Sequence, residues 1–247
     1  MAHFLKPSNV VFLAVGAYNP PTNMHLRMFE LAKDYFCKSG HQVLGGIISP
    51  VHDLYGKKGL LPAVHRIAMV KLAVQSSDWI HFSDWETQQE GWSRTAVSLN
   101  FHKRALHEVN STSTFDWVTK IQKKTTERNP NDPVDIKVKL LCGADLLESF
   151  SVPGLWKDED IENIVRNYGL VVITRSDCNP KKFIYESDLL TRLQDDIDIV
   201  SEWINNEISS TKIRRALRRR ESVKYLIQDP VIDYIKDKNL YSSRMLY

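Results

Sequence analysis

The sequence has few cysteines and no long apolar run. Its three cysteines, Cys37, Cys142 and Cys178, lie far apart and form no C-x-x-C pair, which argues against a disulfide framework and a zinc site and favours a reducing compartment. No stretch reaches the ~18 apolar residues that a membrane-spanning helix needs. The first residues, MAHFLKPSNV, do not have the pattern of a secretory signal. We therefore expect a soluble protein of the cytoplasm, the nucleus or both.

A large excess of one charge is also missing. The chain has 33 Lys and Arg against 30 Asp and Glu, a net charge of +3, so we expect no nucleic-acid partner for the chain as a whole. Two common phosphate-binding motifs are absent too, because neither G-x-x-x-x-G-K-[ST] nor G-x-G-x-x-G occurs. Any phosphate site must therefore come from local placement of other residues.

Short apolar runs that alternate with helical patterns are what the sequence does have. The strand-like runs cover residues 10–15, 42–49, 79–84, 138–143, 169–174 and 197–202. The helical patterns cover residues 24–36, 62–77, 159–168 and 187–196. This alternation predicts an α/β fold, a Rossmann-like doubly wound parallel sheet with helices on both faces, in a single domain of residues 1–247.

One segment does not fit this alternation. From about residue 108 to residue 135 the chain is polar and rich in Ser, Thr, Asn and Pro. It is longer than an ordinary connection between two elements. We therefore expect an insertion here, part of which is mobile.

The stretch GAYNPPTNMH, residues 16–25, follows the first predicted strand. Ligands of open α/β sheets bind beyond the carboxyl ends of the strands, so this stretch is a candidate site. Gly16 would let a phosphate approach the backbone, Thr22 can cap the next helix, and His25 would lie in its first turn. On local chemistry alone, a phosphate donor at His25 and a capped turn with a packed histidine are equally good interpretations.

A second stretch, ISSTKIRRALRRR at residues 208–220, also predicts a helix start that suits an anion. Ser209 or Ser210 can cap the helix, and Thr211 and Arg214 would then lie on one side of its first turn. The remaining arginines favour a solvated helix face over a nuclear-import signal; they are Arg215, Arg218, Arg219 and Arg220.

Together the two stretches resemble paired elements of the nucleotidyltransferase superfamily, G-x-F/Y-x-P-x-T/H-x-x-H and [IV]-S-S-T-x-I-R. Further segments resemble eukaryotic nicotinamide mononucleotide (nicotinate mononucleotide) adenylyltransferase: SPVHDLYGKKGLLPA, WETQQEGW, KLLCGADLLESF, PGLW and NYGLVVITR. The resemblance covers nearly the whole chain except about residues 103–136. Thr22 replaces the first histidine of the superfamily's paired-histidine form. The eukaryotic enzymes also have threonine at this position.

The resemblance implies a role for particular residues. The expected catalytic residues are His25, Lys57 and Arg214, with Lys58 a less favoured choice than Lys57. Those expected to bind ATP and the dinucleotide are Gly16, Ala17, Tyr18, Gly143, Asp145, Asn206, Ser210 and Thr211. Those expected to bind the mononucleotide are Trp92, Thr95, Leu155 and Trp156.

Two of these assignments have structural alternatives. Indole faces attract a cationic nicotinamide ring, so the motif context favours ligand contact over simple packing for Trp92 and Trp156. For Trp79, Trp85 and Trp203, which adjoin strands, packing is the better interpretation; they are not expected in the site. Asp145 could also act as a helix cap after the fourth strand.

The implied activity joins nicotinamide mononucleotide, and also nicotinate mononucleotide, to ATP, which gives NAD or deamido-NAD and pyrophosphate. The mononucleotide phosphate is already an anion, so no general base is needed. Mg²⁺ would be held through the ATP phosphates, with no protein metal ligand. The alternatives are another transferase of the superfamily, or a holdase-type chaperone activity beside catalysis. The sequence leaves open the oligomeric state, including a homo-oligomer, and the preference between the two mononucleotides.

Overall fold

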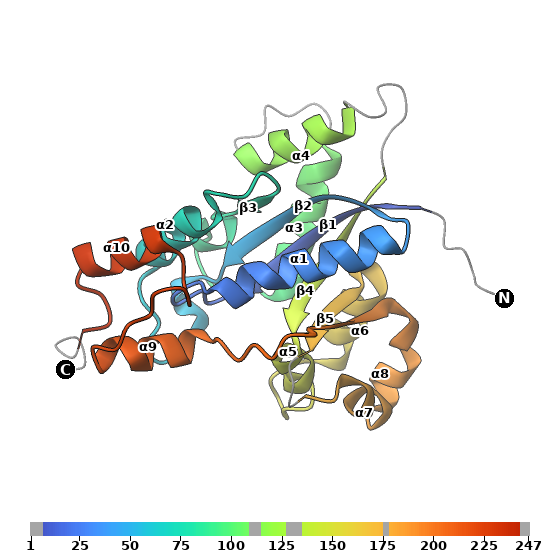
Figure 1. Cartoon of the computed structure of the whole chain (residues 1–247). Helices are drawn as coiled ribbons and strands as arrows, with labels where there is room; N and C mark the ends of the chain where they lie inside the picture. The colour runs from blue at the N-terminus through green and yellow to red at the C-terminus, as the bar shows by residue number, and fades with distance from the viewer. Residues whose placement is uncertain (1–6, 109–114, 127–134, 175–177, 243–247) are drawn as a thin grey trace.

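A six-stranded parallel sheet forms the centre of the protein (Figure 1). The computed structural model describes residues 7–108, 115–126, 135–174 and 178–242. The strands are β1 (Asn9–Gly16), β2 (Gln42–Pro50), β3 (Ile80–Phe82), β4 (Ile136–Gly143), β5 (Leu170–Thr174) and β6 (Ile197–Ser201). They lie in the order β3-β2-β1-β4-β5-β6, and every neighbouring pair is parallel. The predicted doubly wound α/β fold is confirmed.

Helices connect these strands. They are α1 (Asn23–Lys38), α2 (Ala63–Val74), α3 (Thr95–His107), α4 (Asp116–Thr126), α5 (Ala144–Ser149), α6 (Asp158–Tyr168), α7 (Pro180–Tyr185), α8 (Asp188–Arg192), α9 (Ser210–Arg218) and α10 (Asp229–Asp237). Three short 3-10 turns, η1 (Asp53–Tyr55), η2 (Trp85–Gln88) and η3 (Gln194–Asp196), complete the connections. The sequence analysis predicts α1, α2, α6, α8 and the start of α9, but not α3, α4, α7 or α10. Within the described part of the chain, no helix is long and apolar enough to span a membrane.

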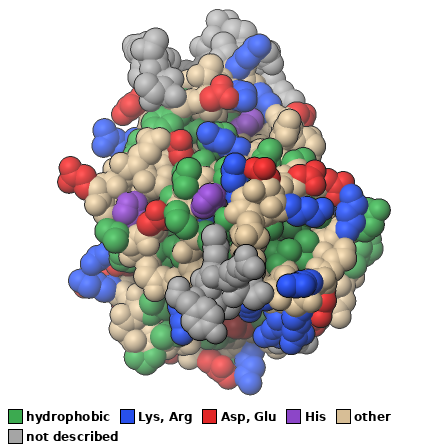
Figure 2. Space-filling view, turned by 90° about the vertical axis from the view of Figure 1, so that its left-hand side faces the viewer, with side chains coloured by type: hydrophobic (Ala, Val, Ile, Leu, Met, Phe, Trp, Pro, Cys, Tyr) green, Lys and Arg blue, Asp and Glu red, His purple; other side chains and the backbone are tan. Residues whose placement is uncertain are grey.

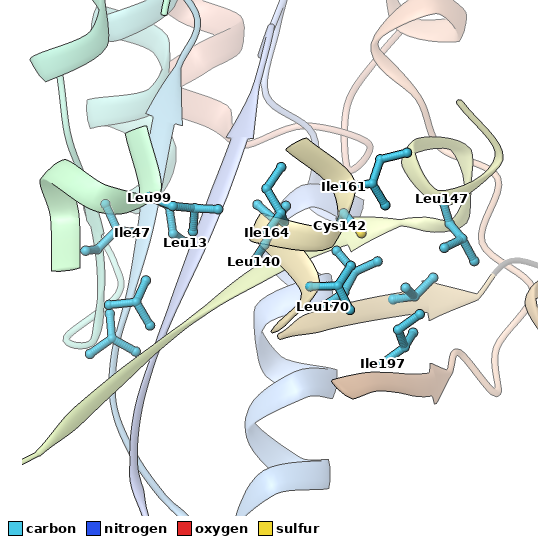
Figure 3. Packing of buried hydrophobic residues seen from close by; sticks show 14 of the residues in the cluster. Leu13, Ile47, Leu99, Leu140, Cys142, Leu147, Ile161, Ile164, Leu170 and Ile197 are labelled. Carbon is cyan, nitrogen blue, oxygen red and sulfur yellow. The ribbon is translucent and has the colours of Figure 1, made fainter. Parts of the chain in front are cut away.

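Alternate side chains of β1 enter two separate cores, one on each face of the sheet. Val11 and Leu13 pack with residues of α3, α5 and α6 on one face (Figure 3). Val10 and Phe12 pack with residues of α1 on the other face. Because helices cover both faces, β1 and β5 contain continuous apolar runs, VVFLAV and LVVI, rather than alternately polar residues.

The chain leaves β1 and β4 toward opposite halves of the sheet. Strand β1 pairs with β2 on one side and with β4 on the other, so these two central strands flank the point where the strand order reverses. Open α/β sheets bind their ligands beyond the carboxyl ends of the strands at this point. Gly16 and Gly143, the last residues of β1 and β4, therefore mark where the site should lie.

The middle of the polar insertion belongs to the core. Trp117, Val118 and Ile121 of α4 are buried on the face that also holds α3. Ile121 packs so closely on β2 that a Cβ atom at Gly45 would lie 2.8 Å from its side chain. The rest of the predicted insertion, residues 109–114 and 127–134, lies outside the described residues.

Candidate active site

The loop after β1 leads directly into the capped N-terminus of α1. Thr22 is the N-cap residue, as predicted, and the backbone N–H of His25 donates to its hydroxyl over 3.4 Å. His25 is the third helical residue and lines a pocket at the carboxyl edge of the sheet. The bond between Asn19 and Pro20 in this loop is cis.

One ring nitrogen of His25 has a defined role. The backbone N–H of Thr22 donates to Nδ1 of His25 over 2.9 Å, which completes a reciprocal capping box. A backbone N–H can only donate, so Nδ1 must be the acceptor and the proton of the neutral ring must be on Nε2. The cap thus makes Nε2–H of His25 a hydrogen-bond donor, so the capped turn that the structure shows is compatible with a phosphate donor at His25.

The N-terminus of α9 lies against the same loop. Ser209 is the N-cap residue, with its hydroxyl accepting from the backbone N–H of Lys212 over 3.3 Å. Arg214 donates to the backbone oxygen of Asn19 over 2.8 Å and to the hydroxyl of Thr211 over 3.3 Å. Ser210 donates to the backbone oxygen of Pro20 over 2.8 Å. The two predicted helix starts are therefore fastened together.

Between the two helix starts lies a pocket that collects most of the predicted phosphate-binding residues. Its lining consists of Ala17, Asn19, His25, Lys57, Lys58, Asp145, Ser209, Ser210, Thr211 and Arg214. The structure does not favour Lys57 over Lys58, since both line the pocket. Three cationic side chains face one carboxylate here, and two helix N-termini add positive potential, so the pocket suits a polyanion.

Asn19 is a lining residue that the sequence analysis missed. Its side-chain amide donates to the backbone oxygen of Gly59 over 2.8 Å and accepts from the hydroxyl of Tyr241 over 2.6 Å. These bonds join the loop after β1 to the lysine-bearing loop and to a residue 222 positions later in the chain. An asparagine between a tyrosine and a proline carries no sequence signal for such contacts.

Gly16 has a close neighbour that the sequence analysis did not expect. A Cβ atom at Gly16 would lie 3.3 Å from the ring of Tyr18, so the missing side chain makes room for Tyr18. Tyr18 is buried, has a φ of 45° and donates to the backbone oxygen of Ala14 over 2.9 Å. Its ring packs edge-on against His25 with centroids 5.2 Å apart. Burial and the nearby carboxylate of Glu86 raise the pKa of Tyr18.

The segment after β4 supplies the carboxylate of the pocket lining. Gly143 is the N-cap of α5, and a Cβ atom on it would lie 2.6 Å from Oδ1 of Asp145. Glycine is therefore needed for the position of the Asp145 carboxylate, which also accepts from the backbone N–H of Leu146 over 3.1 Å. Asn206 lies in the loop before α9, where its side chain accepts from the backbone N–H of Ile208 over 3.1 Å; it does not line the pocket.

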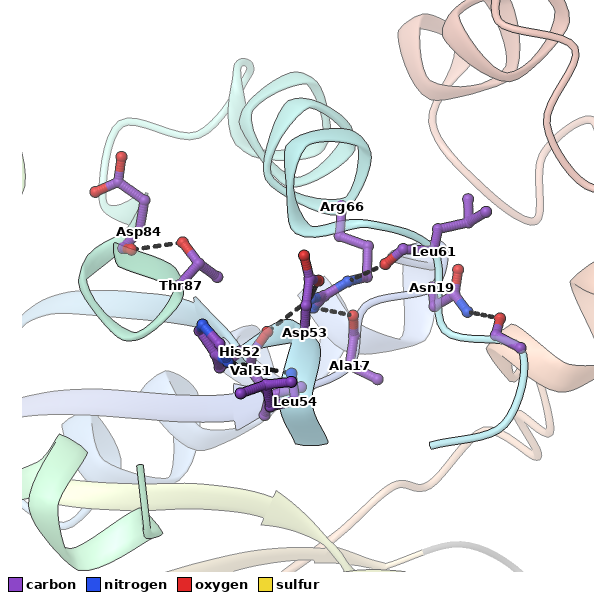
Figure 4. A network of polar contacts seen from close by, with 11 residues as sticks. Ala17, Asn19, Val51, His52, Asp53, Leu54, Leu61, Arg66, Asp84 and Thr87 are labelled. Carbon is purple, nitrogen blue, oxygen red and sulfur yellow. Dashed lines mark hydrogen bonds and ion pairs between the residues drawn. The ribbon is translucent and has the colours of Figure 1, made fainter. Parts of the chain in front are cut away.

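A fully buried arginine that the sequence analysis missed holds the loops around this pocket (Figure 4). Arg66 of α2 donates to backbone oxygens of Ala17 (3.2 Å), Val51 (2.7 Å) and Leu61 (2.8 Å). Its guanidinium also pairs with Asp53 over 2.8 Å. In the sequence Arg66 is one charge within an amphipathic helix, which gives no indication that three loops would supply acceptors.

The residues expected at the nicotinamide ring lie outside this pocket. Trp92 and Leu155 are half exposed, and the ring of Trp92 is 6.2 Å from that of Tyr55. Trp156 is partly buried; it donates from Nε1 to the hydroxyl of Ser149 over 3.0 Å.

An ion pair connects the segments that carry these residues. Arg94, just before Thr95, pairs with Asp160 of α6 over 3.3 Å. The segment of Trp92 and Thr95 therefore adjoins the start of α6, two residues after Trp156.

The tryptophans expected to pack differ in their surroundings. Trp79 is buried and donates to Glu30 over 3.0 Å, and Trp85 stacks on Phe101 with centroids 4.2 Å apart. The packing prediction is wrong for Trp203, which is 77% exposed. It follows β6 in the loop toward α9, where no helix covers it.

The arginines of α9 lie on a mixed surface. Arg215, Arg218, Arg219 and Arg220 are exposed, as predicted for a solvated face. Lys and Arg side chains on this side of the molecule are interspersed with Asp and Glu (Figure 2). Ion pairs such as Lys224–Asp229 and Lys212–Glu207 contribute to this mixture.

Comparison with known proteins shows the family of the chain. Residues 13–216 match the cytidylyltransferase-like family. The chain is 51% identical, over 96% of its length, to nicotinamide-nucleotide adenylyltransferase of Drosophila melanogaster, and spans 62% of that protein. It is 50% identical, again over 96% of its length, to nicotinamide/nicotinic acid mononucleotide adenylyltransferase 1 of Bos taurus, and spans 90% of that protein.

A solved structure shares the fold. The Plasmodium falciparum nicotinic acid mononucleotide adenylyltransferase, complexed with NaAD, superposes with a TM-score of 0.57 at 18% identity, covering 95% of this chain and 97% of that one. The two sequence matches, in contrast, have 50–51% identity and cover 96% of this chain. The chain therefore belongs to the cytidylyltransferase-like family and, within it, to the nicotinamide mononucleotide adenylyltransferases.

Proposed function

We propose that the protein transfers the adenylyl group of ATP to nicotinamide mononucleotide, and to nicotinate mononucleotide, and releases pyrophosphate. The observation that carries this proposal is the pocket between the N-termini of α1 and α9, which gathers His25, Lys57, Lys58 and Arg214. The names of the relatives that are 50% and 51% identical support the choice of substrates.

The residues of the pocket suit an in-line displacement. The mononucleotide phosphate attacks the α-phosphorus of ATP and the bond to the pyrophosphate breaks, so no proton has to be removed from the nucleophile. Catalysis then consists of positioning and of charge stabilisation on the phosphoryl oxygens. Nε2–H of His25 donates to one of these oxygens, while Arg214 and a lysine of the loop after β2 neutralise others.

The donor set also bears on the metal. Among the described residues, no group of three or more His, Cys, Asp or Glu side chains could hold a metal ion, and Asp145 is the carboxylate of the pocket lining. This set suits a Mg²⁺ ion that arrives on the phosphates of ATP, because Mg²⁺ commonly keeps several waters and binds through substrate phosphates. When bound, the ion would neutralise charge on the departing pyrophosphate.

The mononucleotide end would lie toward Trp92, Thr95, Leu155 and Trp156. The indole faces of the half-exposed Trp92 and the partly buried Trp156 suit a flat cationic ring. The nicotinate ring differs by one small group, so we propose that both mononucleotides are accepted.

The test supplies the purified protein with ATP or CTP and with nicotinamide mononucleotide, nicotinate mononucleotide, or phosphopantetheine. Products are separated by chromatography and identified by mass. We expect NAD and deamido-NAD from ATP, with pyrophosphate in equal amount. A product from CTP or phosphopantetheine, with none from either mononucleotide, would reject the proposal in favour of another transferase of the family.

A further inference from the structure

Behind the pocket, Glu86 of η2 carries a carboxyl group with no exposure to solvent. Within the described residues, neither carboxylate oxygen of Glu86, nor the hydroxyl of Ser98, has a hydrogen bond of standard geometry. The backbone of His52, the guanidinium of Arg66 and the hydroxyl of Ser98 nevertheless lie close enough to stabilise its charge. Buried polar groups are normally fully paired, so a loosely held carboxyl calls for a functional explanation.

The neighbours of Glu86 come from the segments after β1 and β2 and from the helices α2 and α3. His52 precedes η1 and the loop that carries Lys57 and Lys58, and η2 lies beside His52 (Figure 4). Ser98 lies one turn after Thr95 in α3. Tyr18 also lies close enough to Glu86 for the carboxylate to raise the pKa of Tyr18. The ring of Tyr18 packs against His25, a catalytic candidate. Glu86 therefore adjoins both the phosphate half and the nicotinamide half of the site.

Glu86 can exist in both protonation states near neutral pH. Burial raises the pKa of Glu86 to about 7. The backbone of His52, the charge of Arg66 and the hydroxyl of Ser98 each act to lower this pKa. Of the charged or titratable groups around it, Arg66 of α2 pairs with Asp53, and Tyr18 stays neutral because its pKa is raised. His102 of α3, one turn beyond Ser98, is also neutral, since burial lowers its pKa to about 4.

We propose that Glu86 is a positioning residue for adenylyl transfer, whose ionised carboxylate accepts from the backbone N–H of His52 and from the hydroxyl of Ser98. Glu86 thereby fixes the position of the loop that carries Lys57 and Lys58 relative to the N-terminus of α3. Protonation removes an acceptor and weakens the attraction to Arg66, which loosens this connection. The inference rests on the proposed function, and predicts that catalysis improves as Glu86 ionises.

The test compares Glu86→Gln, which imitates the protonated form in shape, with the unaltered protein. The kcat/KM for nicotinamide mononucleotide is measured from pH 5.5 to 8.5, and the ratio of the two proteins is taken at each pH. The substrate phosphate also titrates near pH 6, but its ionisation cancels in this ratio. We expect a ratio of about ten or more at the alkaline end, because misplacement of reacting groups is costly, and a ratio near one at pH 5.5.

Ser98→Ala provides a second measurement that does not depend on the first variant folding. The Ser98 hydroxyl lowers the pKa of Glu86, so its removal should move the midpoint of the activity profile to higher pH. A merely structural serine would leave this midpoint where it is. A flat ratio for Glu86→Gln, or an unmoved midpoint for Ser98→Ala, would overturn the assignment of Glu86. Failure of the unaltered protein to form NAD at every pH would instead reject the proposed function.

Discussion

At the scale of single residues, the two nitrogens of His25 have separate tasks. Nδ1 accepts from the backbone of Thr22 and completes the cap of α1, while Nε2 carries the proton that a phosphate oxygen can accept. An acceptor bond at Nδ1 leaves no basic nitrogen on the pocket side of the neutral ring. The same ring therefore caps α1 through one atom and, under the proposed function, would serve catalysis through the other.

Two substitutions separate these tasks. In His25→Gln the amide oxygen can still accept from Thr22, as the third residue of a capping box commonly does, whereas His25→Ala loses both functions. We expect kcat to fall about 100- to 1,000-fold in both variants. Only His25→Ala should also lose about 1 kcal/mol of stability in urea unfolding.

The pH dependence of the two variants distinguishes a donor from a base. If Nε2–H of His25 only donates, the activity profile of His25→Ala keeps the shape of the unaltered profile at a lower level. Loss of one limb of the profile in His25→Ala would show instead that His25 transfers a proton.

Arg66 acts through its four acceptors rather than through the substrate. Arg66→Met leaves the backbone oxygens of Ala17, Val51 and Leu61 without their donor in a buried site. We expect a loss of about 3 kcal/mol or more in the free energy of unfolding, measured in urea. Arg104→Met, at a side chain that is 71% exposed, is the matched control and should change stability by less than about 1 kcal/mol. Equal effects would contradict the role assigned to Arg66.

At the scale of elements, α4 is where the polar insertion contributes to the fold. Its buried residues Trp117, Val118 and Ile121 follow helical spacing, but the surrounding Ser, Thr, Asn and Pro residues obscure this short pattern. Composition describes the average of a segment, whereas burial depends on a few positions. Strands β1 and β5, in contrast, were predictable because burial on both faces makes their runs VVFLAV and LVVI apolar without interruption.

The contact between α4 and β2 can be measured by a double-mutant cycle. Gly45→Ala places a Cβ atom 2.8 Å from the Ile121 side chain and should cost about 1–3 kcal/mol through overpacking. In the background of Ile121→Ala the same change should cost less, because the methyl group then fills vacated space. Urea unfolding of the four proteins gives the coupling energy. An additive result would show that α4 does not dock on β2 in solution.

The candidate site divides in a similar way between what sequence predicts and what it does not. The helix starts at Thr22 and Ser209 follow from local chemistry, and His25 and Arg214 follow from their positions in those helices. Asn19 and Arg66 bond to backbone groups of distant loops, so neither their residue type nor their spacing indicates a role. The packing of Tyr18 beside Gly16 was also not predictable, because nothing in the sequence shows where the Tyr18 ring turns.

At the scale of the whole molecule, buried titratable groups have opposite effects on how the free energy of unfolding depends on pH. The folded-state pKa of Glu86 is raised from 4.5 to about 7, so its contribution to stability is present below pH 4.5 and is lost as the pH rises through 7. The pKa values of His81 and His102 are lowered from 6.5 to about 4. Their contribution is present above pH 6.5 and is lost as the pH falls toward 4.

Glu86→Gln should therefore stabilise the protein at alkaline pH even though it slows catalysis. Relative to the unaltered protein, its free energy of unfolding should rise by roughly 2–3 kcal/mol between pH 5 and pH 8. Thermal or urea unfolding at several pH values measures this, with the exposed Glu159→Gln as a control that stays within about 0.5 kcal/mol. A pH-independent difference for Glu86→Gln would mean that the carboxyl titrates alike in the folded and unfolded chain.

The hydrogen bonds of Asn19 also have a consequence for protein synthesis. Asn19 is translated well before its partners Arg214 and Tyr241, which lie 195 and 222 positions later in the chain. On a nascent chain the loop after β1 therefore lacks these two contacts until both residues have left the exit tunnel. If the pocket works as proposed, a nascent chain could turn over ATP only after that point.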